Sequence, residues 1–191
     1  MEPNGLAECP TVQPRKINRR YCMNSIKHRL LSLVTLMAWL IFLPAAQAGG
    51  LQDFDGQPKS ISDYAGKGKW LVVMIWASDC HICNQEAHAY VDFHFVHADE
   101  DAQVLGITID GQAKKADALK FIERHKVNFP SLIGEPADVA NLFSELTGTY
   151  FVGTPAFLFF DPKGDLRAQQ VGAVPPELIE DFIKQPTTAS K

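Results

Sequence analysis

Two cysteines three positions apart, Cys80 and Cys83, are the residues of this chain best suited to chemistry. They follow the apolar run 70–76, which is typical of a buried strand. If a short turn and then a helix follow that strand, Cys80 lies at the helix N-terminus, where backbone N–H groups and the helix dipole favour a thiolate. Cys83, one turn further on, would share its face and lie within reach of a disulfide. The spacing indicates a redox-active Cys80–Cys83 pair.

The first 48 residues indicate an export signal. The basic stretch 27–29 precedes an apolar run at 30–43, and 46–48 reads Ala-Gln-Ala, which suits a cleavage site. We therefore expect a signal peptide over 23–48 and export to the periplasm.

Two features of this leader stay open. Met23 is a natural start, so 1–22 is either an upstream extension or a start placed too early. The apolar run of 14 residues is shorter than the roughly 20 that cross a bilayer. Residues 30–48 could still reach across if tilted, so an uncleaved anchor is the alternative to cleavage.

The remaining chain has the size and charge of one acidic domain. Residues 49–191 carry 12 Lys and Arg against 20 Asp and Glu, a formal charge of −8. This balance disfavours binding to nucleic acid or to an anionic membrane surface. We expect a single domain over 49–185, a frayed tail over 186–191, and a monomer.

The cysteines that remain after the leader favour a redox-active pair over a structural disulfide. Cys9 and Cys22 precede the expected cleavage site, which leaves Cys80 and Cys83 to pair only with each other. A disulfide closing so short a loop stabilises a fold by only about 2 kcal/mol on the chain-entropy model. A zinc site would need two more ligands of comparable spacing, and the sequence has no second cysteine pair.

Strands and helices are predicted to alternate along the domain. We expect a hairpin over 51–64 around an Asp-Gly turn, in which Ile61 and Tyr64 point inward. Strands are predicted at 70–76, 103–109, 129–133, 156–160 and 166–171, and helices at 80–98, 114–126, 136–146 and 176–184. This order indicates an α/β fold with helices on both faces of a sheet.

Three segments in this order resemble the thioredoxin superfamily and, within it, exported TlpA-like and ResA-like thiol–disulfide oxidoreductases. Residues 76–83 resemble the W-A-x-x-C-x-x-C signature, and 153–164 resemble the stretch with the family's cis-proline and the hairpin after it. Residues 127–149 resemble the strand and helix that these proteins insert. The resemblance implies a thioredoxin-like fold: a central mixed sheet flanked by helices, with an N-terminal hairpin and an inserted strand and helix.

The cysteines would then act in sequence, without an organic cofactor or metal. Cys80, at the exposed helix start, attacks a substrate disulfide, and the shielded Cys83 resolves the mixed disulfide. Thioredoxins carry a buried Asp two residues before the motif's Trp, and here that position is Met74. Relatives of the TlpA and ResA kind often have a Glu three residues after the second cysteine, so we expect Glu86 to assist proton transfer.

Further residues are expected to tune the pair or to contact substrate. His81 and Ile82 lie between the cysteines, and a cation at His81 would stabilise the Cys80 thiolate. Trp76 is expected to pack beside the active-site loop.

The resemblance also assigns a role to the segment at Pro155. It implies that the Thr154–Pro155 bond is cis and faces the cysteines. The backbone at Thr154 would then offer an N–H and a carbonyl to an extended substrate segment.

Histidines and aromatic residues elsewhere are given structural interpretations. His94 and His97 are three apart, as a metal pair would be, but we expect them and His88 to face solvent. We expect core or near-core positions for four phenylalanines: Phe93, Phe95, Phe121 and Phe143. On the helix at 114–126, Leu119, Ile122 and Val127 are spaced for an inward face.

The sequence leaves rival functions. The main prediction is an oxidoreductase acting on cysteines of other exported proteins, and if it is a reductase the resemblance implies a membrane electron donor of the CcdA or DsbD kind. A peroxiredoxin-like peroxidase shares the fold, but its P-x-x-x-[ST]-x-x-C pattern would need Pro and Thr or Ser where Val73 and Ala77 stand. A chaperone that binds copper or thiols would use the two cysteines as soft ligands without turnover.

Overall fold

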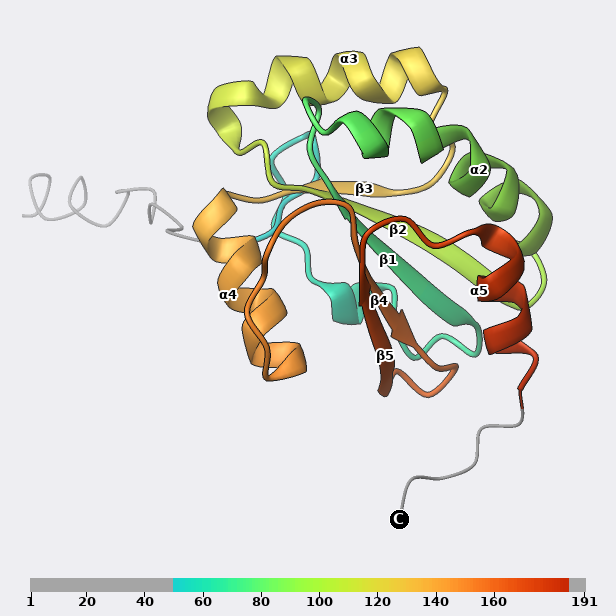
Figure 1. Ribbon diagram of the computed structural model, residues 1–191. Coiled ribbons are helices and arrows are strands. Elements are labelled where there is room, and N and C mark those ends of the chain that lie inside the picture. The colour runs from blue at the N-terminus through green and yellow to red at the C-terminus, as the bar shows by residue number, and fades with distance from the viewer. Residues whose placement is uncertain (1–49, 186–191) are drawn as a thin grey trace, which may run out of the picture. The chain divides into compact units, whose positions relative to one another are not determined.

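The computed structural model describes residues 50–185 (Figure 1). The predictions for the signal peptide and the frayed tail fall outside the described residues. Within residues 50–185, no helix combines the length and the apolar character needed to cross a membrane.

The elements follow the predicted alternation closely. In chain order they are η1 (Ile61–Asp63), β1 (Trp70–Trp76), α2 (His81–His97), β2 (Ala102–Thr108), η2 (Gln112–Lys114), α3 (Lys115–His125), β3 (Ser131–Ile133), α4 (Pro136–Thr147), β4 (Ala156–Phe160), β5 (Leu166–Val171) and α5 (Pro176–Ile183). The helix ends carry the expected signals, since Pro136 begins α4 and Gly148, at a φ of 69°, ends it.

The strands form one mixed sheet in the order β3-β2-β1-β4-β5. Strand β1 is parallel to β2, which is parallel to β3, while β4 is antiparallel to both β1 and β5. Parallel neighbours need crossover connections, and α2 and α3 supply them. The α/β fold with a mixed sheet flanked by helices is therefore confirmed.

Strand β1 is central, and all seven of its residues are buried because helices cover both faces of the sheet. Its side chains alternate between two separate cores. Trp70, Val72, Met74 and Trp76 pack with α2, α3 and α5, whereas Leu71, Val73 and Ile75 pack with α4 and η1. Figure 1 shows α2, α3 and α5 on one side of the sheet and α4 on the other.

The predicted N-terminal hairpin is reduced to a single bridge between Gln52 and Pro58. The hydrogen bonds on either side of this bridge run from the Asp53 N–H to the Gln57 carbonyl and from the Lys59 N–H to the Leu51 carbonyl, each at 2.9 Å. Gln52 pairs also with Ile133 at the β3 edge, with N–H···O distances of 3.0 and 2.8 Å. Of the two residues expected to point inward, Ile61 is buried and Tyr64 is partly buried against the α4-side core.

Two predicted inward residues face solvent. Phe95 is 81% exposed because the buried face of α2 runs through Cys83, Ala87, Tyr90 and Phe93 at helical spacing. Leu119 is 44% exposed because α3 buries the neighbouring Ala118, Phe121 and His125 instead. The remaining predicted phenylalanines, Phe93, Phe121 and Phe143, are buried as expected.

Candidate active site

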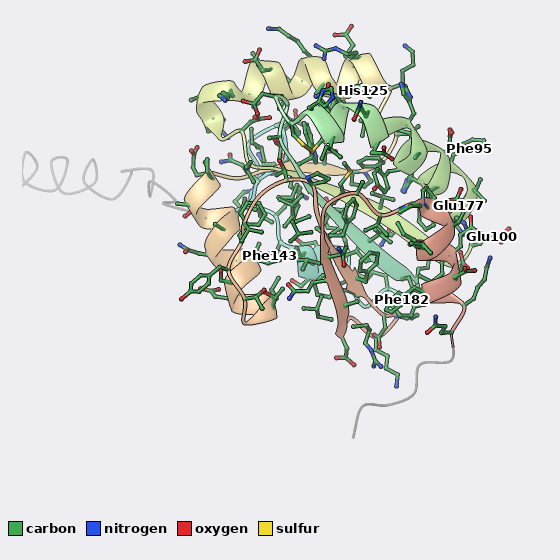
Figure 2. All side chains as sticks on the ribbon, viewed as in Figure 1. Phe95, Glu100, His125, Phe143, Glu177 and Phe182 are labelled. Carbon is green, nitrogen blue, oxygen red and sulfur yellow. A yellow bond between two sulfur atoms is a disulfide. The ribbon has the colours of Figure 1, made fainter. Side chains whose placement is uncertain are left out.

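The cysteine pair lies at the start of α2, just after the loop that follows β1. Cys80 is the N-cap of α2, and its Sγ accepts a hydrogen bond from the Cys83 N–H at 3.1 Å. The two residues form a disulfide with Cα atoms 5.2 Å apart, visible as the yellow bond at the start of α2 in Figure 2. Cys83 is fully buried, whereas Cys80 is partly exposed.

This arrangement gives the two sulfur atoms different chemical roles. In the reduced protein, the same N–H and the positive end of α2 would stabilise a thiolate at Cys80. Only Cys80 is open to an incoming disulfide, and Cys83 lies beneath it in position to displace a product. The arrangement suits thiol–disulfide exchange, in which Cys80 would be the attacking sulfur.

The last residue of β1 lies in the same core cluster as Cys83. Trp76 is 1% exposed and stacks on Phe121 of α3, with ring centroids 4.3 Å apart. Met74, at the position of the missing acid, is buried on the same face of β1.

A second segment reaches the same end of the sheet. The Thr154–Pro155 bond is cis, and the pairing of Ala156 with Ile75 places Pro155 next to the end of β1. The Pro155 carbonyl accepts from the Gly172 N–H at 2.8 Å. Thr154 remains partly exposed at this edge.

The other predicted tuning residues surround the pair at the surface. His81 and Ile82 are exposed in the first turn of α2. Glu86 is partly buried on the same helix, and no hydrogen bond or ion pair found within residues 50–185 joins it to either cysteine. Burial raises the pKa of Tyr90 to about 12, and the negative charge of Glu86 contributes to this rise. The hydrogen bond from Tyr90 to the Val174 carbonyl acts in the opposite direction.

Sequence reasoning missed a buried carboxylate beside the active-site loop. Asp110 follows β2 and accepts from the Ser78 N–H and the Ser78 hydroxyl, each at 3.0 Å. The Thr108 hydroxyl donates to it at 2.7 Å. Only the fold brings Asp110 to Ser78, which is 32 positions away in the sequence.

Asn84 was missed as well. Its side chain bonds to the carbonyls of Ser78 and Cys80 and to two residues of α3, Arg124 and His125. The pKa of His125 is lowered mainly by burial and further by the nearby His88 and Arg124. Figure 2 shows His125 on α3.

Two of the three histidines expected to face solvent do not. His97 is buried between Asp101 and Glu180, with Nδ1 2.8 Å from Asp101 Oδ1 and Nε2 3.5 Å from Glu180 Oε1. His94 is partly buried, accepts from the Val104 N–H at 3.0 Å, and has its pKa lowered by burial. In the described part of the chain, no three His, Cys, Asp or Glu side chains are grouped so that they could hold a metal ion.

Comparison with known proteins agrees with this geometry. The AhpC/TSA family model matches residues 44–169. The thiol-disulfide oxidoreductase ResA of Geobacillus kaustophilus is 27% identical over 135 residues, which is 70% of this chain and 71% of that protein. The peroxiredoxin Bcp of Bacillus subtilis is 33% identical over 89 residues, 46% of this chain and 54% of its own.

A solved structure shows the same fold. The pneumococcal exposed lipoprotein thioredoxin Etrx1 of Streptococcus pneumoniae superposes with a TM-score of 0.54 at 25% identity, covering 70% of this chain and 96% of that one. The chain belongs to the AhpC/TSA family and is a ResA/TlpA-like thiol–disulfide oxidoreductase of the thioredoxin superfamily.

Proposed function

We propose that this oxidoreductase is exported and acts as a reductase on disulfides of other exported proteins. The observation that carries the proposal is the division between an accessible Cys80 and a fully buried Cys83. The leader supports export, and the pneumococcal relative, an exposed lipoprotein, agrees with that location. A membrane donor of the CcdA or DsbD kind would reset the oxidised pair.

Each catalytic turnover reduces one substrate disulfide. The Cys80 thiolate attacks one substrate sulfur and releases the other as a thiolate, and Cys83 then displaces the product, leaving the Cys80–Cys83 disulfide and two reduced substrate sulfurs. Two electrons pass from the protein to the substrate, and the membrane donor returns them.

The direction of electron flow is tested by the reduction potential of the pair, measured against glutathione. A value near that of thioredoxin, about −270 mV, would support a reductase. A value near that of DsbA, about −120 mV, would contradict this direction and indicate an oxidant. With Cys83→Ser, a reductase should accumulate a mixed disulfide through Cys80, because the resolving sulfur is gone.

The surface beside the cysteines supports an extended polypeptide as substrate. Ile82 is 44% exposed between the cysteines, and Val152, two residues before Thr154, is 76% exposed. An extended segment could bond to the Thr154 backbone while its apolar side chains cover these residues.

Matched substitutions test this surface. We expect Val152→Asp to raise KM for a reducible protein such as insulin several-fold with little change in kcat. Val96→Asp is the control, because Val96 is 63% exposed on α2 and lies away from the motif. Equal effects of the two variants would contradict the proposed surface.

We further propose that Glu86 takes part in proton transfer to or from Cys83. It lies one helical turn beyond Cys83 and is partly buried. Glu86→Gln should slow the resolution of the mixed disulfide and alter its pH profile while leaving the attack by Cys80 intact. A profile identical to that of the wild type would remove Glu86 from the mechanism.

A peroxidase is the second candidate, favoured by the family match and by the Bcp relative. Against it, the two positions of the peroxiredoxin pattern hold Val73 and Ala77, which are buried apolar residues without a hydroxyl. We expect slow peroxide consumption compared with insulin reduction. The opposite ranking, measured with an external thiol reductant, would favour the peroxidase.

A further inference from the structure

The side-chain amide of Asn84 uses its full hydrogen-bonding capacity at the active-site loop. Its Nδ2 donates to the carbonyls of Ser78 and Cys80 at 3.0 and 2.9 Å. Its Oδ1 accepts from Arg124 Nη1 at 3.2 Å and from His125 Nε2 at 3.0 Å. An amide group has two donor hydrogens and two acceptor lone pairs, and all four are engaged here.

The partners leave only one orientation for this amide. Carbonyl oxygens accept and a guanidinium only donates, so Nδ2 must face the loop and Oδ1 must face α3. His125 must then carry a proton on Nε2 to donate. In the neutral form of His125, Nδ1 is the bare nitrogen, and it is one of two buried side-chain atoms in residues 50–185 that have no hydrogen-bond partner.

Ser78 is consequently held from two sides. Asp110 binds its N–H and hydroxyl from the β2 side, and Asn84 binds its carbonyl from the α2 side. Asn84 also bonds twice to the Cys80 carbonyl, through its own backbone N–H at 3.1 Å and through Nδ2. None of these bonds involves a sulfur atom, so reduction of the disulfide need not break them.

We propose that Asn84 is a positioning residue of thiol–disulfide exchange, which holds the Ser78–Cys80 backbone in place when the disulfide is reduced. Without that restraint, the reduced loop would gain conformational freedom, and Cys80 would meet Cys83 at a lower effective concentration. The restraint therefore favours the disulfide and makes the pair a stronger reductant. This role rests on exchange by the Cys80–Cys83 pair.

The test is the equilibrium with glutathione, in which two glutathione molecules reduce the protein disulfide and are released as glutathione disulfide. Asn84→Ala and the similarly shaped Asn84→Leu should each shift the equilibrium constant about tenfold toward the reduced protein. For this two-electron couple that is about 30 mV toward less negative potential. His125→Phe, which removes one partner and leaves Asn84 in place, should shift it two- to threefold in the same direction.

Asn128→Ala is the matched control. Asn128 also donates its side-chain amide to a backbone carbonyl of α2, that of Val91 at 3.1 Å, but away from the cysteines. It should leave the equilibrium constant unchanged. A merely structural role of Asn84 would lower the unfolding free energies of the oxidised and reduced proteins equally and also leave the constant unchanged.

The outcomes separate this inference from the proposed function. If the Asn84 and His125 variants equilibrate with the wild-type constant, the positioning role is wrong while exchange stands. If the wild type itself fails to exchange with glutathione, the proposed function is wrong. Should both Asn84 variants fail to fold, the shift in His125→Phe decides, and its absence overturns the inference.

Discussion

The two faces of the sheet bury different kinds of side chain. On the α4 side, the core is mostly aliphatic, and Phe143 and Phe160 are its buried aromatic rings among the described residues. On the side of α2, α3 and α5, the core is rich in aromatic rings and is bordered by buried polar groups, among them Tyr90, His97 and His125.

We interpret this difference as a division of roles, in which the α4 side stabilises the sheet and the side of α2, α3 and α5 surrounds the active site. Buried polar groups cost free energy unless they are hydrogen-bonded, so each one restricts how its neighbours pack. On the side of α2, α3 and α5, Tyr90 avoids this cost because its hydroxyl both donates to the Val174 carbonyl and accepts from the Val174 N–H. The α4 side stabilises β1 by apolar burial alone, and the cysteines extend from the end of that strand.

The largest expected effect is loss of turnover in Cys80→Ala. Removal of the attacking sulfur should abolish insulin reduction, because Cys83 is fully buried and cannot replace it. Reduced wild type and variant should unfold with free energies within about 1 kcal/mol, since Cys80 is only partly buried. Residual exchange by the variant would show that the chemistry is not confined to this site.

A pair of phenylalanine substitutions compares the two faces directly. Phe143→Ala and Phe121→Ala should each lower the free energy of unfolding by about 3–5 kcal/mol, because both rings are buried. Only Phe121 stacks on Trp76, which shares a core cluster with Cys83, so only Phe121→Ala should also shift the reduction potential. Equal reduction potentials in the two variants would contradict this division of roles between the two faces of the sheet.

A smaller effect is expected at the Tyr90 hydroxyl. Tyr90→Phe should lower the free energy of unfolding by about 1–3 kcal/mol, since Val174 loses both bonds to the ring oxygen. Because the pKa in the folded protein is raised from 10.0 to about 12, the wild type keeps this contribution below pH 10 and loses it as the pH rises toward 12. Denaturant titrations at pH 8–12 should show this alkaline loss in the wild type and a weaker one in Tyr90→Phe.

The smallest expected effect is an acid dependence from His94. Burial lowers its pKa below 6.5, so the unfolded chain takes up a proton before the folded one does. Stability is therefore present above about pH 6.5 and decreases as the pH falls below it. His94→Gln, whose amide oxygen could still accept from Val104, should flatten this slope; an unchanged slope would remove His94 as a cause.

The elements were largely predictable because their signals are local. The apolar run 70–76 and the turns around it predicted both ends of β1 correctly, and Pro136 marked the start of α4. The assignment of helix faces was less accurate. Phe95 and Leu119 are apolar but exposed, and His97 is polar but buried, because residue type alone does not say where the sheet lies.

The sequence by itself determined the chemistry of this protein. Two cysteines three positions apart at a strand–helix junction require only local geometry, so Cys80 and Cys83 could be assigned before any fold was known. The tertiary structure alone decided what surrounds them. Asp110 reaches Ser78 across 32 positions and His125 reaches Asn84 across 41, and such contacts depend on how separate elements pack rather than on local spacing.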